Sequence, residues 1–124
     1  MVTTTELIAK KCSSPATALG DAYIKDYLSA VEGWALKEGK ICKTYGFKNY
    51  YETLAFINAI AYVIHAEDHH PELVVTYNRC IVKFDTHSVN AGRGGLSEND
   101  FICAAKIDTI FQQSFALPAA KRVP

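Results

Sequence analysis

Apolar side chains between Asp21 and Gly33 recur with the period of an α-helix. They stand at positions i, i+3, i+4 and i+7: Ile24, Tyr27, Leu28 and Val31. Asp21 is a residue type that caps helix starts, and Gly33 is a type that follows helix ends. The pattern predicts a first helix that buries one of its faces.

Period-two alternation replaces the helical spacing after this segment. Trp34 and Leu36 alternate with smaller or polar residues up to the sequence Glu38-Gly39-Lys40, and residues 41–47 form a second alternating run. Glycine between two such runs favours a tight turn. These residues predict a first β-hairpin.

A long helix is predicted over residues 49–67, with Asn49 and Glu52 at capping-box spacing and Pro71 beyond its end. More than half of its circumference is apolar, so one sheet face cannot cover it. We expect one stripe to cover the sheet and another to need a second helix or a second subunit. The sheet-facing stripe is expected to be Leu54, Ile57, Ala61 and Ile64, and the other Phe56, Ile60 and Val63.

Residues 73–77 and 80–87 alternate again around Asn78-Arg79, which predicts a second hairpin. A glycine-rich loop over residues 88–95 leads to Ser97 and Asp100, again at capping-box spacing, and predicts a last helix to about Ser114. The element order is therefore α-β-β-α-β-β-α. It predicts an α+β fold, in which helices pack on one face of a four-stranded antiparallel sheet.

The length of 124 residues, with 49% of them hydrophobic, indicates one globular domain. We expect this domain over residues 21–117. Residues 1–20 carry Thr, Ser, Pro and Gly with little periodicity and are expected to form a flexible arm, while residues 118–124 are expected to fray.

The charge balance and the termini narrow the class of protein. Thirteen basic and thirteen acidic side chains give no net charge, which disfavours direct binding to nucleic acid. Residues 1–11 contain no apolar core after a basic start, so we expect no secretory signal there. The apolar run at residues 54–66 is too short for a span of about 20 residues. We therefore expect no membrane association and a cytoplasmic location.

The four cysteines have neither C-x-x-C spacing nor histidines at finger-like spacing. Cys42, Cys80 and Cys103 lie in apolar segments, where a free thiol usually serves as a small buried side chain. The glycine-rich loop matches neither a phosphate-binding loop nor a dinucleotide fingerprint. None of these features predicts a zinc knuckle, a redox dithiol or a nucleotide site.

All four histidines fall within 23 consecutive residues, beside three carboxylates. They are His65, His69, His70 and His87, with Glu67, Asp68 and Asp85. Imidazoles that converge suggest acid–base catalysis, because their ordinary pKa lies near neutrality. They also suggest a metal site if the helix reaches His69, since His65 and His69 would then share a face. Histidines that only cap or pack remain a third possibility.

Four motifs in this order are characteristic of one enzyme family. They are Glu67-Asp68-His69-His70-Pro71-Glu72, Tyr77-Asn78, Thr86-His87 and Gly95-Leu96-Ser97-x-x-Asp100. With them the chain resembles the pterin-4a-carbinolamine dehydratases. The resemblance extends over residues 24–110 through Gly33-Trp34, Phe47-Lys48-Asn49-Tyr50, Ala55-Phe56 and Ala104-Ala105-x-Ile107-Asp108. The chain departs from the family pattern at three places. His65 stands where many members have Glu, Leu73 stands where animal members have Trp, and the loop before Leu96 is longer than in animal members.

The resemblance implies an enzyme that removes water from 4a-hydroxytetrahydropterin, giving quinonoid dihydropterin in tetrahydrobiopterin recycling, without metal or organic cofactor. It places proton transfer on His69 and His87, and positioning of the pterin on His70. It assigns an acidic site residue to Asp100. Further substrate contacts carry over to Asp68, Asp85, Thr86 and Ser88.

Two questions about partners and roles follow from the same resemblance. Animal members also act as dimerisation partners of a transcription factor, so a protein-interaction module is the alternative function. The apolar surplus of the long helix predicts a homodimer or homotetramer. Asp100 could either close a helix capping box or accept a hydrogen bond from an imidazole, and both roles could hold at once.

Overall fold

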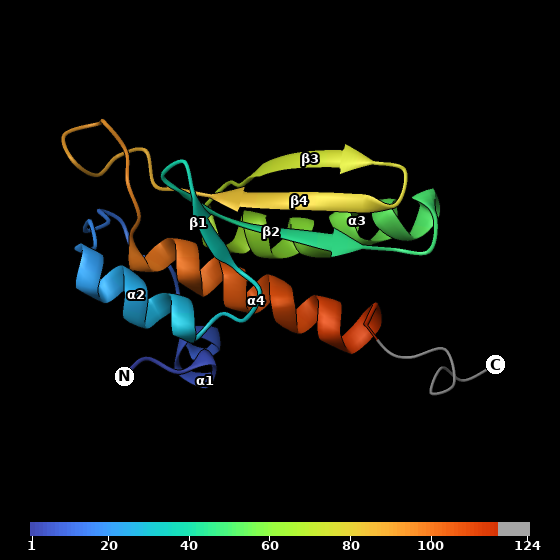
Figure 1. Ribbon diagram of the computed structural model, residues 1–124, viewed down its shortest axis with the longest axis horizontal. Coiled ribbons are helices and arrows are strands. Elements are labelled where there is room, and N and C mark those ends of the chain that lie inside the picture. Colours follow the sequence, from blue (N-terminus) through green and yellow to red (C-terminus); the bar gives the residue numbers. More distant parts are fainter. Residues whose placement is uncertain (117–124) are drawn as a thin grey trace.

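A computed structural model describes residues 1–116 (Figure 1). Four antiparallel strands form one sheet in the order β1-β2-β4-β3. The elements are α1 (Thr4–Ala9), α2 (Asp21–Ser29), β1 (Ala35–Lys37), β2 (Lys40–Gly46), α3 (Tyr50–Glu67), β3 (Glu72–Thr76), β4 (Arg79–Phe84) and α4 (Glu98–Ser114). The predicted α+β fold, with helices against one face of the sheet, is confirmed, and α1 precedes the predicted order.

The core lies between the sheet and the helices α3 and α4. Its largest side chains are fully buried aromatic rings: Tyr45, Phe56, Phe84 and Phe101. Tyr45 and Phe56 contact each other with ring centroids 4.8 Å apart, so β2 and α3 are joined directly. No helix within residues 1–116 is long and apolar enough to cross a membrane.

The face of α3 that meets the core differs from the prediction. Phe56 and Ile60 are fully buried beside Thr53, whereas Leu54 is 38% exposed and Ala61 is exposed. The predicted sheet-facing stripe was therefore wrong, because Phe56 of the other stripe packs on Tyr45 of β2, whereas the expected second helix for that other stripe is present as α4. Helix α4 accounts for the reversal, because it lies beside α3 and shares its buried side (Figure 1).

The first 20 residues pack on the domain. The side chain of Leu7 in α1 is fully buried in the core. Ala18 forms an isolated antiparallel bridge with Ser97, and the Leu19 amide donates to the Leu96 carbonyl at 2.8 Å. The expectation of a loosely attached arm missed these contacts. The expected frayed tail, residues 118–124, lies outside the described residues.

The end of the second hairpin also differs from the prediction. The turn falls at Tyr77-Asn78, and β4 ends at Phe84 rather than at His87. Beyond it, Thr86 and Gly95 exchange backbone hydrogen bonds of 2.7 and 3.1 Å, which close the base of the loop between them. This bridge orients the chain at the point where β4 leads into α4.

Candidate active site

The candidate site forms where α3 ends, β4 ends and α4 begins. Helix α3 ends at Glu67, and Asp68 takes the left-handed conformation, with φ 49° and ψ 44°. An Asp tolerates this conformation better than most residues, and it reverses the chain direction directly after the helix. His69 consequently enters the interior while its neighbours Asp68 and His70 stay exposed.

The central contact joins His69 to Asp100. His69 Nε2 lies 2.6 Å from Asp100 Oδ1, with side-chain exposures of 12% and 0%. The imidazole also stacks on Phe84, with centroids 5.6 Å apart and planes 5° apart. When the carboxylate accepts a hydrogen bond from Nε2–H, the tautomer is fixed and Nδ1 becomes the nitrogen that can exchange a proton.

The second oxygen of Asp100 holds the start of α4. Oδ2 accepts hydrogen bonds from the Ser97 amide and the Thr86 hydroxyl, both at 2.9 Å, and the hydroxyls of Thr86 and Ser97 lie 2.7 Å apart. Ser97 and Asp100 also form a capping box. One carboxylate therefore occupies both geometries considered from the sequence: the helix cap through Oδ2 and the imidazole partner through Oδ1.

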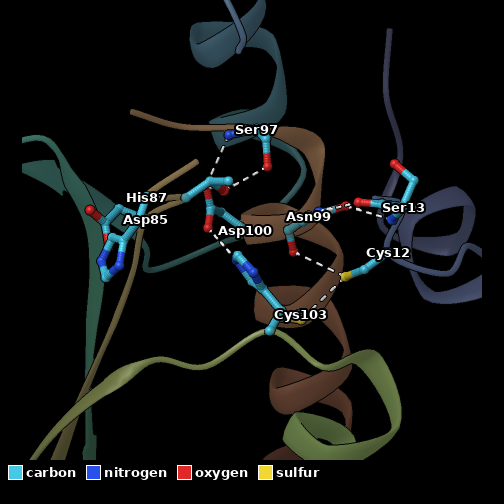
Figure 2. A network of polar contacts seen from close by, with 10 residues as sticks. Cys12, Ser13, Asp85, His87, Ser97, Asn99, Asp100 and Cys103 are labelled. Atoms are coloured by element: carbon cyan, nitrogen blue, oxygen red, sulfur yellow. Dashed lines mark hydrogen bonds and ion pairs between the residues drawn. The ribbon is translucent and has the colours of Figure 1, made fainter. Parts of the chain in front are cut away.

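The remaining histidines lie outside this buried network. His87 Nε2 is 3.1 Å from Asp85 Oδ1, with His87 83% exposed and Asp85 19% exposed. Figure 2 shows this pair on one side of Asp100. His70 is 70% exposed, and its Nε2 lies 3.6 Å from Asp68.

The premise for a metal site on α3 is wrong, because the helix stops before His69. His65 is exposed on the last turn, so the two imidazoles do not share a helix face. Within residues 1–116, no group of three His, Cys, Asp or Glu side chains is arranged to hold a metal ion.

A cavity of about 330 Å³ opens beside His69. Its lining residues come from four parts of the chain: Cys12, Ser13, Ser14, Ala16, Glu67, Asp68, His69, Thr86, Ser88 and Asn99. A larger hollow of about 860 Å³ lies on the open face of the sheet, around lysines of β1, β2 and β4. The smaller cavity is the candidate site, because its lining includes the largely buried imidazole of His69.

Six of these lining residues are not among the site residues predicted from the sequence: Cys12, Ser13, Ser14, Ala16, Glu67 and Asn99. Glu67 accepts from the Cys12 amide at 2.8 Å and from Lys106 Nζ at 2.7 Å. Burial opposes ionisation of Glu67, but these two hydrogen bonds and the Lys106 charge outweigh it and lower its pKa. The motif that begins at Glu67 points to this carboxylate from the sequence, but its contacts with the arm and with α4 appear only in the tertiary structure.

A buried imidazole held by a carboxylate, on an α+β sandwich of helices and sheet, defines a site suited to acid–base chemistry. The family model described as "Pterin 4 alpha carbinolamine dehydratase" matches residues 17–110. This chain belongs to that family, as its motifs indicated.

Individual relatives agree with the family. A Bdellovibrio bacteriovorus protein with the provisional name pterin-4-alpha-carbinolamine dehydratase is 57% identical over 94% of this chain and 97% of its own length. A Nitrosospira multiformis protein of the same provisional name is 48% identical over 83% and 88%. The crystal structure of a transcriptional coactivator/pterin dehydratase from Brucella melitensis superposes with a TM-score of 0.69 and 30% identity, covering 75% of this chain and 97% of that one.

Proposed function

We propose that the protein is a dehydratase that converts 4a-hydroxytetrahydropterin to quinonoid dihydropterin, using histidines as acid and base. The observation that carries the proposal is the 2.6 Å contact between His69 and the fully buried Asp100. This geometry holds one imidazole in a single orientation at the cavity wall. Such orientation is what a proton-transfer group requires.

The reaction requires one proton donor and one proton acceptor. The N5 lone pair drives cleavage of the bond between C4a and oxygen, a donor protonates the leaving oxygen, and an acceptor removes the proton from N5. The products are water and the quinonoid dihydropterin. We assign proton transfer to His69 and His87, with Asp100 as the group that orients His69. Each transfer by a positioned imidazole is worth about 10²–10⁴-fold in rate.

Groups in the cavity and beside it would bind the pterin: Asp68, Thr86 and Ser88 belong to the cavity lining, and His70 and Asp85 do not. We assign positioning to His70, and contacts with polar edges of the ring to Asp68, Asp85, Thr86 and Ser88. Thr86 is buried and its hydroxyl donates to Asp100, so besides contacting the ring it would hold the carboxylate in place. His70 and Asp68 are exposed and can rearrange around an incoming ligand.

A direct assay tests this function. We expect purified protein to accelerate dehydration of freshly generated 4a-hydroxytetrahydropterin well above the buffer rate, followed by absorbance of the quinonoid product. Because the proposed chemistry uses imidazoles alone, exhaustive chelation should leave the rate unchanged. Folded protein that gives the buffer rate would move the assignment to the interaction-module alternative, and activity restored only by Zn²⁺ would support a metal enzyme.

The two exposed histidines should give different kinetic signatures. We expect His87→Ala to lower kcat about 100-fold, because a proton-transfer group is lost, and His70→Ala to act mainly on KM. Thermal unfolding should change little in either variant, since both rings are largely exposed. Near-wild-type kcat in His87→Ala would remove proton transfer from this residue.

Self-association is expected through the outer face of α3. Apolar side chains at helical spacing lie exposed there: Tyr51 (80%), Leu54 (38%) and Tyr62 (76%). The face around Asn58 lacks charged side chains between these positions, so a second copy can pack on it symmetrically. Light scattering at micromolar concentration should show a dimer or tetramer. Tyr62→Glu should lower the measured mass toward the 13.7 kDa of a single chain. A wild-type monomer would refute this expectation.

A further inference from the structure

The N-terminal arm forms part of the cavity that holds His69. Four lining residues, Cys12, Ser13, Ser14 and Ala16, belong to the segment 12–16. This segment precedes residues 17–110, the region that the family model matches. The wall it builds is therefore an addition to the part of the chain that defines the family.

Asn99 fixes the position of this wall. Its Oδ1 accepts from the Ser13 amide at 3.0 Å, and its Nδ2 donates to the Ser13 carbonyl at 2.9 Å. Asn99 is 7% exposed and directly precedes Asp100 on α4. A second anchor is the Cys12 amide on Glu67. The arm is thus hydrogen-bonded to the first turn of α4, the same turn that carries Asp100, the partner of His69.

The wall formed by residues 12–16 lies on the side of Asp100 opposite to His87. Figure 2 shows Asp100 between the Asp85–His87 pair on one side and Cys12, Ser13 and Asn99 on the other. His69 and the arm line the same cavity, so a substrate whose reacting carbon lies at His69 can place a remote part of its structure against the arm.

The arm and the loop residue Ser88 present mainly serine hydroxyl groups to that remote part of the substrate. Ser13, Ser14 and Ser88 all line the cavity and are exposed to it or to solvent. Ser13 uses its backbone groups for Asn99, so its hydroxyl stays available to a ligand. Hydroxyls that both donate and accept are suited to a ligand with hydroxyl groups of its own.

We propose that residues 12–16 form the wall that recognises a hydroxylated substituent of the reduced pterin, with Asn99 as its positioning residue. The inference rests on the proposed dehydratase function and deepens it, because it assigns the substrate class that the arm selects. It makes the arm a determinant of KM, while His69 and its partner set kcat.

Two substrates test the recognition. The 4a-hydroxy forms of a tetrahydropterin with a dihydroxypropyl side chain and of its 6-methyl counterpart differ only at the proposed contact. We expect wild-type KM to be at least about fivefold lower for the hydroxylated substrate, and Ser13→Ala/Ser14→Ala to reduce this ratio to about one. Thr5→Ala, an exposed change in α1 outside the cavity, is the matched control and should keep the ratio.

The cysteines give a measure of arm position that needs no activity. Cys12 Sγ lies 3.6 Å from Cys103 Sγ. The azo oxidant diamide takes two electrons and two protons from this pair, giving one disulfide and a hydrazine, with Cys12→Ser as the blank. We expect Asn99→Ala to slow the cross-link about fivefold or more and to raise KM for the hydroxylated substrate, with kcat much less affected. If Asn99→Ala does not fold, Asn99→Asp keeps the acceptor for the Ser13 amide and replaces the donor to the Ser13 carbonyl with a carboxylate oxygen, which repels that carbonyl.

The outcomes separate the two proposals. A wild-type enzyme that dehydrates both substrates with equal KM, or a double serine variant that keeps the preference, overturns the recognition by the arm and leaves the dehydratase standing. Cross-linking at the wild-type rate in Asn99→Ala overturns the positioning role of Asn99. A wild type that dehydrates neither substrate overturns the dehydratase and the arm's recognition together.

Discussion

His69→Ala is expected to lower kcat at least about 100-fold, because it removes the one imidazole that the fold itself orients. Its Nε2 is held at 2.6 Å by Asp100 and its ring is stacked on Phe84, so no nearby side chain can replace it in the same orientation. Stopped-flow measurement of the dehydration at saturating substrate gives the effect on kcat directly.

Two variants control this result. His65→Ala removes an exposed imidazole of the same α3 region and should leave kcat within about twofold. Asp100→Asn keeps the shape of the partner but not its charge, and we expect at least a tenfold loss of kcat with melting lowered by a few degrees. His69→Ala with near-wild-type kcat would contradict the assignment. If the kcat of Asp100→Asn stays within twofold of the wild-type value, Asp100 acts only as a helix cap.

The sequence predicted the site residues better than their surroundings. Local patterns located the capping box at Ser97 and Asp100, because a helix start depends on residues three positions apart. They also placed His69 just after a helix. They could not show that Asp68 takes a left-handed conformation and turns His69 inward, because that choice depends on what His69 can pack against.

Errors in the fold came from tertiary contacts. Helix α3 is apolar around most of its surface, so its own sequence does not say whether Leu54 or Phe56 faces the core. The position of α4 decides it, and Phe56 is buried against Phe111 of that helix with centroids 6.0 Å apart. The arm was missed for the same reason. Its contacts with Asn99 and Glu67 join residues more than fifty positions apart and leave no periodic trace.

The family motif near the end of α4 has a structural explanation in Asp108. Oδ2 of this carboxylate accepts from Trp34 Nε1 at 3.0 Å, and Oδ1 accepts from Lys43 Nζ at 2.9 Å and from the Tyr45 hydroxyl. Burial, together with the Asp108 charge, raises the pKa of Tyr45 far above its ordinary value and keeps it a donor. One side chain thus joins α4 to β2 and to the segment before β1.

Asp108→Ala is therefore expected to have the largest effect on stability, a loss of about 3 kcal/mol in the free energy of unfolding. Asp108 and Lys43 are only 16% and 19% exposed, and Trp34 and Tyr45 are buried. The three donors that lose their acceptor can therefore form few hydrogen bonds with water instead. For a domain of this size, the melting temperature should fall by roughly 10–15 °C. Thermal and urea unfolding followed by circular dichroism measure both quantities.

Asp108→Asn separates the charge from the hydrogen bonds. The amide oxygen can still accept from one or two of the three donors, but the ion pair with Lys43 is lost, so we expect about half of the destabilisation. Because Asp108 lies outside the lining of the cavity beside His69, the kcat of the folded fraction at low temperature should be that of wild type for both variants. If Asp108→Ala melts within about 3 °C of wild type, the three donors find other partners and the carboxylate does not hold these segments together.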